Sequence, residues 1–216
     1  MHKLIFLFVG LLMFGCGKRD IKRTWSYDMF GDTLYEAKWF YAESPEGIGQ
    51  GIQYYISEVG DTILNQYYYY NQEGVIDTLE SEFYTLEIFP TDTLDRYKGT
   101  LTLHTMFGKM RIDAKNRRRL QLLYHEITDS VILSSVISER SNRLEFYYSN
   151  TIDHHLTGVL LQDVFRDTII GQDTLVQYGK TRLLVDTRES TNNSFIQSHR
   201  FLKIKRKGNK YGYFLE

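Results

Sequence analysis

The sequence predicts an all-β fold, an antiparallel β-sandwich or a partly closed barrel or meander, with little or no helix beyond the N-terminal apolar segment. Short runs rich in Tyr, Ile, Val, Leu, Phe and Thr alternate with turn residues along the chain, which is typical of antiparallel strands. No segment after residue 20 keeps a helical period. Seventeen tyrosines against two prolines favour extended structure, and an aromatic content of 15% is too high for a disordered chain.

These patterns place strands along the whole chain after residue 22, each bounded by Gly, Asp, Asn or Ser. The predicted strands are 23–30, 34–42, 51–58, 63–70, 81–89, 99–107, 109–113, 120–127, 130–138, 143–148, 155–163, 167–171, 174–185, 199–206 and 211–215.

A recurring dipeptide, Asp followed by Thr, marks the turns between these strands. It occurs at residues 32–33, 61–62, 77–78, 92–93, 167–168, 173–174 and 186–187. An Asp side chain can accept hydrogen bonds from the backbone N–H groups that follow it and so close a turn. The β-branched Thr then favours extended chain. The carboxylates are too scattered for a calcium loop, so we interpret the dipeptide as hairpin punctuation.

The N-terminus carries the pattern of an export signal. Lys3 supplies a positive charge, and residues 4–14 are almost uninterrupted apolar residues, as in the n-region and h-region of a secretory signal peptide. At about 1.5 Å per residue this run is too short to cross a hydrocarbon core of about 30 Å. We therefore expect residues 1–15 to be cleaved.

Cys16 follows the apolar run in the sequence Met13-Phe14-Gly15-Cys16 and is the only cysteine of the chain. This segment resembles the lipobox of bacterial lipoproteins, in a looser form familiar in the Bacteroidota. The resemblance implies that Cys16 becomes the acylated first residue of the mature protein. Acylation removes a thiol that has no disulfide partner, and two or three acyl chains give stable anchoring.

The expected organisation is a signal peptide (1–15), a lipidated cysteine with a short tether (16–22) and an all-β domain (23–216). Gly17 follows the cysteine where an acidic residue would resemble an inner-membrane retention signal, so we expect an outer-membrane protein that faces the periplasm. Display on the cell surface is the alternative. Since Lys3 is the one charged residue removed, the mature chain keeps 25 basic against 27 acidic side chains. This near-neutral balance gives no argument for a nucleic-acid partner.

Four consecutive tyrosines, Tyr67, Tyr68, Tyr69 and Tyr70, are the most suggestive candidate binding residues. Successive side chains of a strand face opposite ways, so one alternating pair can enter the core and the other lies on the opposite face. Exposed tyrosines are typical of recognition surfaces and could stack on sugar rings or contact a protein. Cross-strand aromatic pairing, worth about 0.2–1 kcal/mol per pair, is the structural alternative.

The segment 51–84, with paired tyrosines and a glycine turn, loosely resembles MORN-like β-hairpin repeats, and no function follows from that resemblance. A weak echo of residues 66–71 at residues 145–150 leaves open two related halves that meet near residues 115–119.

Other candidate sites have weaker patterns. Asp153, His154 and His155 could offer metal ligands, but adjacent strand histidines face opposite ways, and His104, His125 and His199 stand singly. We therefore predict no metal site and no cofactor. The basic stretch 115–119 is interpreted as an exposed connection, and the lysines of 203–210 as guards of an edge strand.

No nucleophile elbow, zinc-binding helix or phosphate loop occurs in the sequence, so an enzyme has no support. The expected function is a non-enzymatic binding or interaction module anchored to the envelope membrane, with an envelope protein or a glycan as partner. A structural envelope component without a ligand, and a periplasmic glycan hydrolase with paired carboxylates, are the alternatives.

Overall fold

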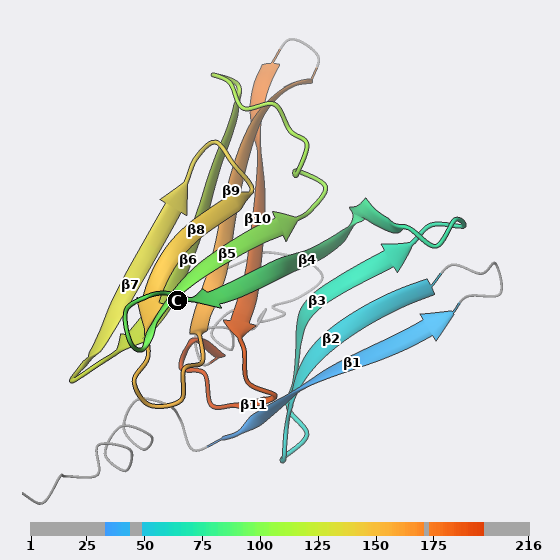
Figure 1. Cartoon of the computed structure of the whole chain (residues 1–216). Coiled ribbons are helices and arrows are strands. Elements are labelled where there is room, and N and C mark those ends of the chain that lie inside the picture. The colour runs from blue at the N-terminus through green and yellow to red at the C-terminus, as the bar shows by residue number, and fades with distance from the viewer. Residues whose placement is uncertain (1–32, 44–48, 171–172, 197–216) are drawn as a thin grey trace, which may run out of the picture.

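The computed structural model describes residues 33–43, 49–170 and 173–196 of the 216-residue chain. These residues form two antiparallel sheets, of seven and four strands (Figure 1), and the described strands close no barrel. The predicted all-β, antiparallel, sandwich-type fold is confirmed. Cys16, His199, the basic stretch 203–210 and the predicted strands 23–30, 199–206 and 211–215 lie outside the described residues.

The seven-stranded sheet has the order β11-β1-β2-β3-β4-β5-β8, and the four-stranded sheet has the order β10-β9-β6-β7. In chain order the strands are β1 (Tyr35–Glu43), β2 (Gly49–Ser57), β3 (Thr62–Tyr70), β4 (Ile76–Pro90), β5 (Arg96–His104), β6 (Asn116–Ile127), β7 (Val131–Ser138), β8 (Arg143–Ser149), β9 (Thr157–Ile170), β10 (Asp173–Asp186) and β11 (Ser190–Thr191).

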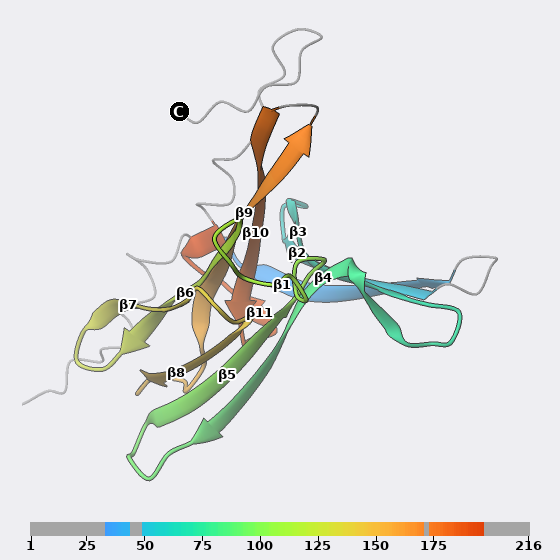
Figure 2. The same ribbon diagram turned by 90° about the horizontal axis from the view of Figure 1, so that it is seen from above.

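Strand β4 joins two differently directed parts of the large sheet. Its first residues pair with β3, through Ile76 opposite Tyr70, and its later residues pair with β5, through Phe83 opposite His104. The β3–β4 register shifts between these regions, and such irregularities sharpen strand twist. Figure 2 shows the result, in which β1, β2 and β3 extend away from the body formed by β5, β8 and the small sheet.

The main core lies between β5 and β8 on one side and β6, β9 and β10 on the other. Alternate apolar side chains of these strands face inward, as the period of two requires. The fully buried members include Leu101, Leu120, Leu144, Leu160 and Leu183.

The last part of β10 is buried on both faces, which ties the two parts of the molecule together. Leu183 and Val185 belong to the main core. Leu184 faces the other way and packs in a second cluster with Tyr35, Tyr55 and Ile196. The β1–β2 hairpin is therefore held against the small sheet by apolar burial.

Three sequence-based expectations are wrong. The predicted strand 109–113 is not a strand: a turn ends at Lys109, where Met110 N donates to Phe107 O (3.1 Å), and irregular chain follows it. The predicted strands 155–163 and 167–171 form one long strand, β9. The basic stretch 115–119 is no exposed connection, because Asn116 begins β6 and Arg118 is only 4% exposed.

The Asp-Thr dipeptide closes turns at some positions only. Asp186 Oδ1 accepts a hydrogen bond from Arg188 N (3.0 Å) at the end of β10, as expected of a turn. Asp167 and Thr168 instead lie within β9, opposite Val176 and Leu175 of β10. A long, regular hairpin register outweighs the local preference of Asp for turns there.

Candidate functional site

The tyrosines of β3 alternate between the two faces of the sheet, as the strand period predicts. The Tyr67 and Tyr69 rings contact each other with centroids 6.0 Å apart, and the Tyr68 and Tyr70 rings do so at 5.3 Å. All four side chains are half-buried. The four rings therefore contact each other in pairs along β3, and ligand binding by them stays a prediction.

Tyr68 and Tyr70 belong to a continuous line of rings that we call the aromatic row: Tyr41, Trp39, Tyr68 and Tyr70. Trp39 of β1 contacts Tyr68 at 5.3 Å and stacks with Tyr41 at 6.4 Å. Tyr41 is 70% exposed. The row thus crosses from β1 to β3 and offers ring surface to the solvent at the β1 end.

A glycine explains how rings from β1 and β3 meet across the intervening strand. Gly51 of β2 pairs with Tyr68, and a Cβ atom at Gly51 would lie 2.5 Å from the Tyr68 ring. The missing side chain lets this ring lie over β2 and reach Trp39. Burial, followed by hydrogen bonds with Tyr41 and Tyr70, raises the pKa of the Tyr68 hydroxyl.

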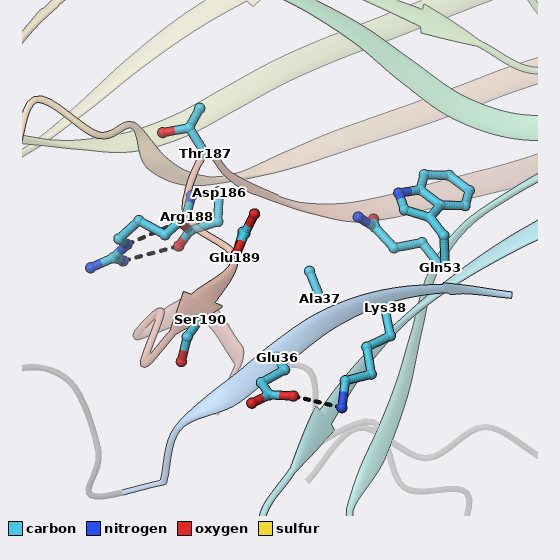
Figure 3. A pocket seen from close by; sticks show the side chains of 10 residues that line it. Glu36, Ala37, Lys38, Gln53, Asp186, Thr187, Arg188, Glu189 and Ser190 are labelled. Carbon is cyan, nitrogen blue, oxygen red and sulfur yellow. Dashed lines mark hydrogen bonds and ion pairs between the residues drawn. The ribbon is translucent and has the colours of Figure 1, made fainter.

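A polar cavity of about 560 Å³ adjoins the aromatic row at Trp39. Strands β1 and β2 form one side, through Ala37 and Gln53, and the loop from β10 to β11 forms the other, through residues 186–190 (Figure 3). Trp39 of β1 also lines the cavity. This volume lies in the range of small-ligand pockets. An aromatic wall and a polar wall therefore meet in one concave site.

The carboxylate of Asp186 organises the loop side of the cavity. Its side chain is fully buried, and Arg188 binds it with two hydrogen bonds, from Nε to Oδ1 and from Nη2 to Oδ2, both 3.0 Å long. Thr191 Oγ1 also donates to Oδ2 (2.5 Å). Burial opposes the Arg188 charge, but the hydrogen bonds and charge of Asp186 outweigh it and raise the Arg188 pKa. Paired hydrogen bonds between a guanidinium and a carboxylate are short and fix the geometry of both groups.

The opposite wall carries a second ion pair. Lys38 Nζ lies 2.6 Å from Glu36 Oε2 on the exposed face of β1 (Figure 3). With both pairs formed, Glu189 is the remaining charged side chain that lines the cavity. The site therefore presents many hydrogen-bonding groups with little net charge.

Amide side chains fix Gln53 where it faces the cavity. Gln53 Oε1 accepts hydrogen bonds from Asn65 Nδ2 and Gln66 Nε2, both 2.8 Å long. Asn65 lies at a bulge in β3 and also bonds the backbone of Leu184 in β10, accepting from its N–H (2.6 Å) and donating to its carbonyl (3.1 Å). The network thus joins β2, β3 and β10 behind the site.

The sequence pointed to the tyrosines but missed the polar half of the site. Asp186 belongs to a dipeptide interpreted as a turn, and Gln53, Asn65 and Arg188 have no motif around them. Alternation along β1 and β3 is the one signal that could place Trp39 beside the tyrosines, but it needs the strand pairing, which sequence alone does not supply.

The hydrolase alternative requires a carboxylic acid with a raised pKa beside the substrate. Among the described carboxyl groups, Glu82 has such a shift, caused by burial and opposed by a hydrogen bond from Thr181. Glu82 does not line the cavity. Asp186, which does, forms an ion pair with Arg188.

The histidine pair does not converge on a metal site. His154 Nδ1 lies 3.1 Å from Asn150 O, while His155 Nδ1 lies 3.0 Å from Thr187 Oγ1. His154 has a φ of 62°, and both histidines precede β9, which begins at Thr157 rather than at the predicted residue 155. Within residues 33–43, 49–170 and 173–196, no three metal-ligating side chains gather.

The part of the chain that the structure describes contains no helix long and apolar enough to cross a membrane. Comparison with protein-family models, with curated proteins and with solved structures finds no match to this chain. The site's own geometry is therefore the basis for a functional proposal.

Proposed function

We propose that this protein is an outer-membrane lipoprotein, anchored through Cys16 and facing the periplasm, that binds a neutral saccharide. The observation that carries the binding proposal is the junction at Trp39, where the aromatic row meets the polar cavity. The anchor rests on the resemblance of residues 13–16 to a lipobox.

The chemistry of the two walls fits a sugar better than a charged ligand. Aromatic faces pack against apolar faces of a ring, and amide, hydroxyl and carboxylate groups supply the hydrogen bonds that hydroxyl groups need. Glu36 with Lys38, and Asp186 with Arg188, neutralise each other. Glu189 is the one charged lining residue outside these pairs, so the site has little net charge, and a polyhydroxylated neutral molecule uses its donors and acceptors best.

Calorimetry on the full chain in detergent tests the proposal. The ligands are short neutral oligosaccharides of glucose, galactose and N-acetylglucosamine. We expect saturable binding by the wild type and a loss of at least about tenfold in affinity for Trp39→Ala, since buried Trp contacts are often dominant. Tyr147→Ala is the matched control, because Tyr147 is an exposed aromatic of β8 outside the site. Its affinity should equal that of the wild type.

Equal affinities of the wild type and Trp39→Ala would contradict the proposal. An envelope protein that is retained by the wild type and lost with Trp39→Ala, in the absence of saccharide binding, would instead assign the same surface to a protein partner. If the wild type binds neither a saccharide nor an envelope protein, the proposal is wrong and a structural envelope component without a ligand is the remaining alternative.

A further inference from the structure

A second cavity, of about 370 Å³, lies at the start of β6, away from the aromatic row. Four arginines line it, Arg117, Arg118, Arg119 and Arg140, and Glu139 is the one acidic residue among its lining residues. Ile112 and Phe165 complete its wall. Such an excess of one charge in a concave site is unusual, because like charges repel one another most where solvent is excluded.

The cavity occupies the edge of β6 where its neighbour ends. Pairing of β6 with β7 begins at Leu120, opposite Ser138, while pairing with β9 on the other side already begins at Asn116. Residues 117–119 therefore pair with β9 on one side. On the other side, the described residues of β7 do not reach them. Side chains from both faces of β6 can reach this edge: Arg117 and Arg119 from one, Arg118 from the other.

Arg118 has fewer partners than its burial requires. It is 4% exposed, its Nη2 donates to the carbonyl oxygen of Phe107, and its Nε has no hydrogen-bond partner. Burial lowers its pKa. Among the described residues no carboxylate lies within ion-pair distance of it, so a buried guanidinium is left without a counter-charge at the cavity.

The neighbouring arginines also keep most of their binding capacity. Arg117 has a long ion pair with Asp167 (3.9 Å) and lies over the Phe165 ring at 5.7 Å. Arg119 and Arg140 are exposed and form no ion pair with a described residue. Each guanidinium is a planar fork that matches two oxygens of a phosphate or sulfate.

We propose that this cavity binds a multiply charged oxyanion, a phosphate or sulfate group, held by Arg118, Arg119 and Arg140. The anion supplies the counter-charge that Arg118 lacks and relieves repulsion among the arginines. Ile112 and Phe165 form an apolar wall that would accept the organic part of a phosphate monoester, such as a lipid or sugar phosphate, as well as the free ion. This site is separate from the saccharide site and does not depend on it.

The test measures binding of two probes to the full chain by calorimetry in an uncharged detergent. The probes are inorganic phosphate and dihexanoyl phosphatidic acid, a soluble phosphate monoester. The Arg119→Gln/Arg140→Gln variant replaces two exposed residues, so it is expected to fold, whereas Arg118→Gln changes a buried one. Arg96→Gln/Lys98→Gln removes the same charge from β5, outside the cavity, and is the matched control.

We expect saturable phosphate binding by the wild type, weakened at least tenfold in Arg119→Gln/Arg140→Gln and within twofold of the wild type in the control. Tighter binding of phosphatidic acid than of inorganic phosphate would identify a lipid or other monoester as the source of the group, and equal binding would identify the free ion. Absence of saturable binding by the wild type to either probe would overturn the proposal. Equal weakening in both double variants would also overturn it, since that is the result of a general charge effect.

Discussion

At the scale of single residues, Glu82 is the described carboxyl group whose surroundings oppose its charge. Burial raises its pKa above the ordinary value of 4.5, although Thr181 Oγ1 donates a hydrogen bond to it (2.7 Å). The folded state therefore binds more protons than the unfolded state between the two pKa values. Stability is highest below 4.5 for this group and falls as the pH rises through that window.

Glu82→Gln should remove this pH dependence, because the amide keeps an oxygen for Thr181 and carries no charge to desolvate. We expect a higher Tm than the wild type at pH 7, and a Tm difference that shrinks as the pH approaches 4.5. Thermal melts followed by circular dichroism at several pH values measure it. Glu80→Gln, at an exposed position of the same strand, is the control and should follow the wild type. A lower Tm of Glu82→Gln at pH 7 would show that the charge is stabilising.

The sequence predicts the direction of a side chain where it depends on neighbouring residues of one strand. It does not predict contacts between residues that come from separate segments. Alternation of Tyr67–Tyr70 across the sheet follows from the strand period alone and is confirmed. The buried pair of Asp186 and Arg188 was missed, because the two residues also fit an ordinary exposed turn. Its role depends on β11 and the turn before β9, which supply Thr191 and Asp153. No spacing in the sequence indicates that convergence.

At the scale of strands, composition and turn residues placed nearly every described strand to within a few residues. The predictions missed the short β11 and the first residues of β4 and β6. Strand β6 begins with Asn116, a poor strand former, and three arginines, which are not among the residues enriched in strands. Pairing with Phe165 and Val164 of β9 holds them in the sheet. Tertiary pairing, which a single sequence does not show, outweighed local propensity here.

Asn65 is the side chain through which β3 protects the edge of β10. Its amide occupies the N–H and carbonyl of Leu184, as a neighbouring strand would. Asn65→Ala leaves both buried backbone groups without these partners, at a cost of about 2 kcal/mol. For a domain of this size that corresponds to a Tm lower by about 4–8 °C.

Asn142→Ala is the matched comparison, because the Asn142 side chain makes one hydrogen bond to the described residues, from Nδ2 to Leu103 O (3.0 Å). We expect it to cost about half as much in the same thermal melts, near 1 kcal/mol. An equal fall in Tm in the two variants would mean that the Asn65 contact with the edge of β10 stabilises the protein no more than a single hydrogen bond does.

At the scale of the whole molecule, two cores share strand β10. Strands β5 and β8 cover one face of its last residues, at Leu183, and strands β1 and β2 cover the other face, at Leu184. The polar cavity lies between β1, β2 and the loop that follows β10, and the arginine cavity lies at the edge of β6. The two proposed sites therefore occupy different parts of the fold, and a variant of one should leave the other intact.

The proposed lipid anchor at Cys16 would hold both proposed sites at the membrane, and the Cys16→Ser variant tests it. A serine cannot receive the thioether-linked lipid, so the protein should be exported but not attached. We expect the wild type in the membrane fraction, labelled by radioactive palmitate, and Cys16→Ser unlabelled in the soluble fraction. Two or three acyl chains hold a protein on a membrane far more firmly than one, because each buried CH₂ contributes about 0.8 kcal/mol. The difference between the fractions should therefore be nearly complete. Equal fractionation of the two proteins as soluble material would refute the lipoprotein assignment, while leaving the binding measurements on the two cavities, which use purified chain, to be judged separately.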